Sequence, residues 1–131
     1  MSWNPRPVPC LRLWRGLGHL LLVLGLVVAL LPALPGVGRV AFGDKILHAG
    51  AFAFLMLWYA QIYPFGRERW RIAGRLILFG AGIEILQSLV PYRSADAWDL
   101  LADAAGVALG ALLAHTRLGH LLSRFETQAA A

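Results

Sequence analysis

The chain has 131 residues, which gives room for one domain. Its residues are 59% hydrophobic and only 15% charged, and a soluble domain of this size could not bury so much apolar surface. The net charge of +5 could indicate a nucleic-acid partner, but the basic residues flank the apolar segments and form no stripe or patch. The composition therefore predicts a small polytopic membrane protein and no nucleic-acid partner.

Four apolar segments approach the roughly 20 residues that a helix needs to cross a bilayer. We expect them at 16–34, 46–63, 72–90 and 98–114. The sequence thus predicts an all-α fold, a compact bundle of four transmembrane helices over residues 16–114. A cytosolic lead (1–15) precedes it and a cytosolic tail (115–131) follows it. Because the stretch 31–36 has no clear cleavage site, we expect the first segment to remain as a span.

The basic residues predict the orientation of the bundle. Nine of the twelve lie before the first segment, between the second and third or in the first turn of the third, or after the fourth: Arg6, Arg12, Arg15, Arg67, Arg69, Arg71, Arg75, Arg117 and Arg124. Cytoplasmic loops of membrane proteins carry an excess of Lys and Arg. We therefore expect a multi-pass protein of the inner or plasma membrane, with both termini in the cytoplasm.

Small and capping residues predict how the segments begin and pack. Gly18, Leu22, Gly25 and Ala29 form a narrow stripe on the first segment, which suits close helix approach. Asp44 is placed either to cap the second helix or to join a site. Residues 65–71 predict a short polar connection, so the second and third helices should be antiparallel neighbours. Asp96 is expected to be a solvated loop residue or a helix cap.

Polar residues recur inside the apolar segments in one register. Asp44 and His48 share a face of the second segment, and Glu84 and Gln87 share a face of the third. On the fourth segment one stripe contains Asp99, Asp103, Gly106 and Gly110. The predicted orientation sends all three polar faces to the outer third of the bilayer, with His48 about 6 Å and Glu84 roughly 9 Å from the outer helix ends. Gly80 and the Gly-x-x-x-Gly pair should allow the backbones below to pack closely.

An ionisable group at membrane depth marks a functional site by default, but each of these residues also has a structural alternative. Glu84, His48 and Asp99 are the candidate catalytic residues, and whether the protein is an enzyme stays open. The candidate ligand-binding residues are Lys45, Arg93, Gln87, Asp44 and Asp103. Alternatively, Gln87 and His48 join helices by hydrogen bonds, and Arg93 pairs with Asp96 or Asp99. We predict no metal and no cofactor, since no helical His-Glu-x-x-His spacing is present.

The order and spacing of these residues resemble the VanZ-like family of small membrane proteins. The resemblance covers about residues 40–114 and rests on the runs Asp44-Lys45-Ile46-Leu47-His48-Ala49-Gly50-Ala51-Phe52 and Gly82-Ile83-Glu84-Ile85-Leu86-Gln87, on Arg93, and on Asp99 with Gly106 and Gly110. The family's signature positions carry over to Asp44, Lys45, His48, Glu84, Gln87, Arg93 and Asp99. Asp103 departs from the family pattern, which commonly has Asn there.

The resemblance implies a role in cell-envelope or glycopeptide-related physiology, because the founding member is associated with low-level teicoplanin resistance. Our first hypothesis is a polar pocket near the external leaflet that acts on an amphiphilic, anionic ligand such as a lipid-linked precursor. Lys45 and Arg93 would hold the anion, His48 and Glu84 would exchange protons, and Asp99 would orient a partner. The alternative is a non-enzymatic bundle that docks or scaffolds a larger envelope protein. The lipid bilayer is the expected partner, and the oligomeric state stays open.

Overall fold

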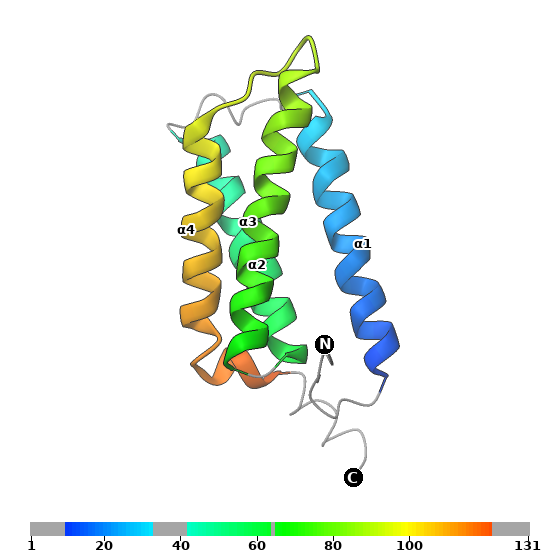
Figure 1. Cartoon of the computed structure of the whole chain (residues 1–131), viewed down its shortest axis with the longest axis vertical. Helices are drawn as coiled ribbons and strands as arrows, with labels where there is room; N and C mark the ends of the chain where they lie inside the picture. Colours follow the sequence, from blue (N-terminus) through cyan, green and yellow to red (C-terminus); the bar gives the residue numbers. More distant parts are fainter. Residues whose placement is uncertain (1–9, 33–41, 64, 122–131) are drawn as a thin grey trace.

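The fold is a bundle of helices in a computed structural model that describes residues 10–32, 42–63 and 65–121. In this part of the chain four α-helices pack together: α1 (Leu11–Leu30), α2 (Gly43–Ile62), α3 (Arg67–Ser88) and α4 (Ala97–Leu113). A short 3-10 helix, η2 (Arg117–His120), follows α4. The end of α1, the beginning of α2 and the α3–α4 connection lie at one end of the bundle (Figure 1). The predicted all-α fold of four packed helices is confirmed.

The helix bounds differ from the predicted ones most in α1 and α3. α1 extends from Leu11 to Leu30, so it begins and ends earlier than the predicted 16–34, and the described Leu31 and Pro32 are not helical. Residues 1–9 of the predicted lead and 122–131 of the tail lie outside the described residues. α3 begins at Arg67, so most of the polar connection expected at 65–71 is helical. Gly66, with φ 119°, reverses the chain in a conformation that favours glycine. Glu68 in the first turn and its 3.1 Å ion pair with Arg71 then favour helix immediately afterwards.

Glycines let the backbones of α2 and α4 approach closely, and these two helices form the most extensive contact in the bundle. A Cβ atom on Gly106 would collide with the carbonyl of Ala49, and one on Gly110 would collide with the carbonyl of Ala53. The close packing predicted for this glycine pair is confirmed. The stripe predicted on α1 holds only in part, because Gly18 packs against α2 side chains whereas a Cβ atom on Gly25 would meet nothing within 4 Å.

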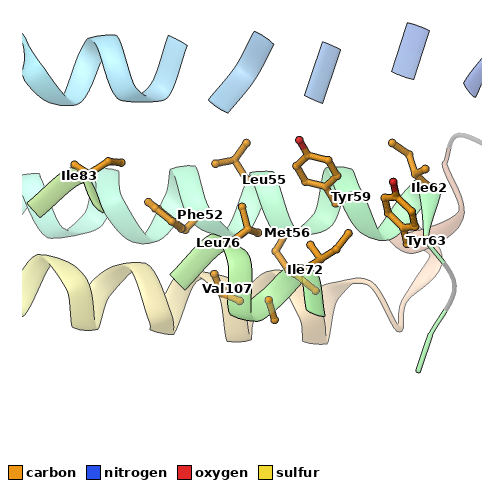
Figure 2. Close-up of a cluster of buried hydrophobic side chains, with 11 residues drawn as sticks. Phe52, Leu55, Met56, Tyr59, Ile62, Tyr63, Ile72, Leu76, Ile83 and Val107 are labelled. Atoms are coloured by element: carbon orange, nitrogen blue, oxygen red, sulfur yellow. The ribbon is translucent and has the colours of Figure 1, made fainter. Parts of the chain in front are cut away.

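The apolar core is centred on α2. Its large buried side chains come from α2, from α3 and from α4, and they are Phe52, Leu55, Met56, Tyr59, Ile62, Ile72, Leu76, Ile83 and Val107 (Figure 2). α1 contributes little to this core, since Gly18 is its one buried residue among those described. Partly buried α1 side chains, among them Trp14 and Leu22, pack against the outside of this core.

Arg69 has a role that the charge pattern did not predict. Its side chain is only 6% exposed, and its guanidinium donates to the carbonyls of Ala60 (3.3 Å) and Tyr63 (3.4 Å) at the end of α2. The last carbonyls of a helix have no partner within the helix, so Arg69 satisfies two of them. This arginine ties α3 to α2 as well as adding to the basic loop.

Two of the described helices, α1 and α2, are long and apolar enough to cross a membrane by length and composition. α4 has 17 residues, and α3 begins with a run of charged side chains. The prediction of four spans is thus supported for two helices, and the composition suggests membrane association. Large apolar side chains are nevertheless exposed on all four helices, among them Val28 (55%), Leu47 (50%), Leu78 (72%) and Leu112 (67%).

Candidate functional site

The polar residues of α2 and α4 meet at one end of the bundle. His48 Nδ1 lies 2.8 Å from Asp103 Oδ1, and His48 Nε2 lies 3.9 Å from Asp99 Oδ2. All three side chains are buried, and Asp103 is completely so. Gly106 lies one turn below Asp103 and brings α4 against α2, so the glycine packing sets the short distance between the histidine and the carboxylates.

Lys45 joins the beginning of α2 to the beginning of α4. Its ammonium group donates to Asp96 Oδ2 at 2.8 Å and to Asp99 Oδ1 at 3.0 Å. Asp96 is also the N-cap of α4, where its other oxygen accepts from the backbone N–H of Trp98 at 2.9 Å. The Lys45 ammonium and this N–H hold the pKa of the Asp96 carboxyl below its usual range. Of the two roles expected for Asp96, the cap is confirmed, with the ion pair in addition.

Asp44 does not cap α2, contrary to one of its two predicted roles. The N-cap position is Phe42, with φ 59°, and no side chain accepts a hydrogen bond there. Asp44 instead lies in the first turn, where a negative charge suits the helix dipole, and approaches the polar cluster. Single ligand atoms of Asp44, His48 and Asp99 lie within 4.8 Å of one another, so these three could hold a divalent cation. Such a cation would compete with Lys45 for Asp99.

Glu84 brings α3 to the same end. Its side chain is 7% exposed, and Oε2 accepts from the backbone N–H of Asp96 at 2.8 Å. Its charged neighbours are Asp99, His48 and Asp103. Glu84 Oε1 is buried and has no hydrogen-bond partner within the described part of the chain. Glu84 therefore fixes the loop that starts α4, and it keeps one acceptor oxygen unused.

The remaining polar residues attach α1 through its last carbonyls. Gln87 Nε2 and an Arg93 guanidinium nitrogen both donate to the carbonyl of Ala29, at 2.8 and 2.9 Å, and the Tyr92 hydroxyl donates to the carbonyl of Leu30 at 3.1 Å. Of the two roles considered for Arg93, the pairing with Asp96 or Asp99 does not form, because Lys45 pairs with both carboxylates. Tyr92 was not predicted, since its acceptor is a backbone group that no side-chain pattern reveals.

A cavity of about 380 Å³ opens beside this cluster, between α1 and α2. Its walls are apolar, with Leu24 and Val28 from α1 facing Leu47 and Leu55 from α2. Its polar lining residues are Asp44, His48 and Arg93. We refer to it as the upper cavity, because it adjoins the polar end that Figure 1 shows at the top. The structure thus places the predicted site residues at one end of the bundle, but Gln87 donates to the carbonyl of Ala29, and of these residues only Asp44, His48 and Arg93 line the cavity.

Fold and site together define a helical bundle with a polar cluster shared by all four helices at one end. The sequence profile of the VanZ/LLP1 family matches residues 11–120, so the chain belongs to that family and the resemblance noted from the motifs is confirmed. An uncharacterized protein of Schizosaccharomyces pombe (strain 972 / ATCC 24843) is 32% identical over 99 residues, which is 71% of this chain and 57% of that protein. The chain therefore spans little more than half the length of this relative. No solved structure matches the chain.

Proposed function

We propose that this chain is an integral membrane protein whose four helices cross the bilayer and whose polar end binds an amphiphile with an anionic headgroup. The two apolar helices and the large apolar side chains exposed on the bundle support the membrane location. The arginines at the beginning of α1 and of α3 lie at the end opposite the polar cluster. The positive-inside rule then favours cytoplasmic termini and a polar cluster in the external leaflet.

The observation that carries the ligand proposal is the upper cavity. Its volume of about 380 Å³ falls in the range of roughly 300–1,000 Å³ that small-molecule sites occupy. Its apolar walls suit an acyl chain, and Arg93 is the cation among its lining residues. An apolar groove that ends at a guanidinium group matches a molecule with a hydrocarbon tail and a phosphate or carboxylate head. In the cell, such a ligand fits a role in cell-envelope physiology.

The contacts divide the polar residues into two groups. Arg93 and His48 line the cavity, so we assign them to the headgroup, with His48 as the group that exchanges a proton. Asp103 orients the His48 ring through their 2.8 Å contact. Lys45 was expected to hold the anion, but its two carboxylate partners already compensate its charge, so we assign it to the α2–α4 link. Glu84 holds Asp96 and hence the start of α4.

A glycine substitution tests the upper cavity directly. Gly25 lines it, and a Cβ atom there would meet nothing within 4 Å, so Gly25→Leu fills the cavity without a clash at the backbone. The full chain in detergent would be titrated with phosphatidic acid or phosphatidylcholine, and native mass spectrometry would count the lipid copies retained. We expect wild type to retain phosphatidic acid preferentially and Gly25→Leu to retain one copy fewer.

The matched control is Gly16→Leu. Gly16 lies on the same helix, a Cβ atom there also meets nothing within 4 Å, and the residue does not line the upper cavity. This variant should retain as many copies as wild type. Equal retention by Gly25→Leu and Gly16→Leu, or equal retention of the two lipids by wild type, would contradict the proposal.

The docking alternative is favoured by one observation, which is that most of these polar groups bridge helices. Lys45, Gln87 and Arg93 all donate across helix boundaries, and His48 contacts α4. A bundle held together in this way needs no ligand at the cluster. The same lipid titration separates the two proposals, because a purely structural cluster predicts no copy of phosphatidic acid that Gly25→Leu removes.

A further inference from the structure

A second cavity lies beside α1, toward the end of the bundle opposite the polar cluster. Its volume is about 220 Å³, and α1, α2 and α3 all line it. None of the polar site residues described above contributes to it, and Phe79 is the one residue shared with the upper cavity. We refer to it as the lower cavity. Its floor is apolar, with Leu22, Ile72 and Leu76.

The lining of the lower cavity is basic. Arg15 and His19 come from α1, and Arg75 comes from α3. Among the described residues that line it there is no carboxylate. Two guanidinium groups on facing helices, with a histidine beside them, suit an anionic group at this site.

Tyr59 supplies an independent indication of a ligand. Its side chain is 8% exposed, and its hydroxyl is buried with no hydrogen-bond partner within the described part of the chain. Figure 2 shows the hydroxyls of Tyr59 and Tyr63 directed toward α1. A Cβ atom on Gly18 would lie 3.0 Å from the Tyr59 oxygen, so the glycine leaves room for this hydroxyl beside α1. A buried hydroxyl without a partner is unfavourable, and an acceptor in the cavity would satisfy it.

We propose that the lower cavity binds the phosphate group of an anionic amphiphile from the cytoplasmic leaflet. Arg15 and Arg75 contact the phosphate oxygens, the Tyr59 hydroxyl donates to one of them, and the apolar floor receives the first carbons of the chain. The cavity is smaller than the roughly 300 Å³ at which small-molecule sites begin, so it accommodates a headgroup and leaves the acyl chains in the bilayer. This proposal rests on the membrane orientation of the proposed function, but it does not require that the upper cavity binds a ligand.

The experiment is carried out in the Gly25→Leu background, so that the upper cavity is filled and copies bound elsewhere are counted alone. Native mass spectrometry with phosphatidic acid should still show one retained copy. Tyr59→Phe removes only the hydroxyl, Arg15→Gln removes one charge, and each should weaken retention about tenfold or more. The control Tyr92→Phe removes a hydroxyl at the other end of α1 and should leave this copy in place.

Inorganic phosphate identifies the source of the phosphate. Displacement of the retained lipid by millimolar phosphate would assign the cavity to free phosphate, and retention in its presence would assign it to a lipid headgroup. Diacylglycerol, which lacks the phosphate, should not be retained. Undiminished retention by both Tyr59→Phe and Arg15→Gln would overturn the proposal. Thermal unfolding of the lipid-free protein provides a second measurement, in which Tyr59→Phe should unfold no earlier than its parent because the hydroxyl has no partner to lose.

Discussion

At the scale of single residues, the polar end of the bundle contains buried carboxylates and the basic groups that pair with them. Asp99 and Asp103 are carboxylates with 4% and 0% exposure, and they face one lysine and one histidine. Removing one partner of a buried ion pair leaves an uncompensated charge, which is far more costly than losing the attraction between them. Lys45 is therefore needed to compensate the carboxylates at the start of α4 and to hold α2 against α4, whether or not a ligand binds next to it.

The Lys45–Asp96 pair predicts a pH dependence of stability. The pKa of Asp96 is lower in the folded chain than in the unfolded chain. Its contribution is therefore complete above about pH 4 and is lost as the pH falls through the lowered value. Asp96→Asn keeps a good N-cap residue but loses the charge. We expect its melting temperature in detergent to lie below that of wild type at pH 7, by less than about 5 °C, and this difference to shrink as the pH falls below about 4.

Salt provides the control for this prediction. Because added salt screens an exposed ion pair, it should reduce the difference in melting temperature between wild type and Asp96→Asn at pH 7. A difference between the two melting temperatures that changes with neither pH nor salt would mean that Asp96 acts through its cap geometry and not through its charge.

The sequence predicted which residues gather at the polar end but not how they pair. Helical periodicity placed His48, Glu84 and Asp99 on faces that meet, because register along a helix is fixed by 3.6 residues per turn. The pairing considered for Arg93 does not form, because its acceptor is the backbone carbonyl of Ala29, which no side chain marks. Lys45 was not predicted as a partner of Asp99, because only the three-dimensional positions of the helix ends bring its ammonium group to that carboxylate.

At the scale of helices, the bundle is uneven. α2 and α4 pack tightly through the glycine contacts. α1 is attached by hydrogen bonds at both ends, because its last carbonyls, Ala29 and Leu30, accept from polar side chains and the carbonyl of Trp14 accepts from Trp58. The Gly-x-x-x-Gly contact could be predicted because small residues on one helix face allow two backbones to approach closely. The open space beside Gly25 on α1 could not be predicted, because a stripe of small residues looks the same in the sequence whether or not a neighbouring helix packs against it.

The glycine contact gives the prediction at this scale. Gly106→Ala places a methyl group against the carbonyl of Ala49, and overpacking of this kind costs about 1–3 kcal/mol or more. We expect a clear fall in the melting temperature in detergent, together with loss of any lipid copy that depends on the upper cavity. Gly82→Ala on α3 is the matched control, because a Cβ atom there meets nothing within 4 Å and alanine favours the helix. Equal melting temperatures for the two variants would refute the tight α2–α4 contact.

At the scale of the whole molecule, two cavities lie beside α1, one toward each end of the bundle, and they differ in their polar lining residues. The upper cavity ends at Asp44, His48 and Arg93, and the lower cavity ends at two arginines and a histidine, with Phe79 between them. Both proposals place an amphiphile parallel to α1, with its headgroup at the nearer membrane surface. They depend on which end faces the cytoplasm, and the charge pattern alone supports that orientation.

The single cysteine makes this orientation measurable. Cys10 is exposed just before α1, and the sequence contains no other cysteine. In intact cells, a membrane-impermeant maleimide should leave Cys10 unlabelled until the membrane is permeabilised. In a Cys10→Ser, Ser94→Cys variant the label should react without permeabilisation, because Ser94 is exposed in the α3–α4 connection at the polar end. The reverse pattern would place the polar cluster in the cytoplasm and exchange the leaflets that the two cavities serve. Labelling of both positions in intact cells would contradict a bundle that crosses the membrane, because Cys10 and Ser94 would then lie on the same side.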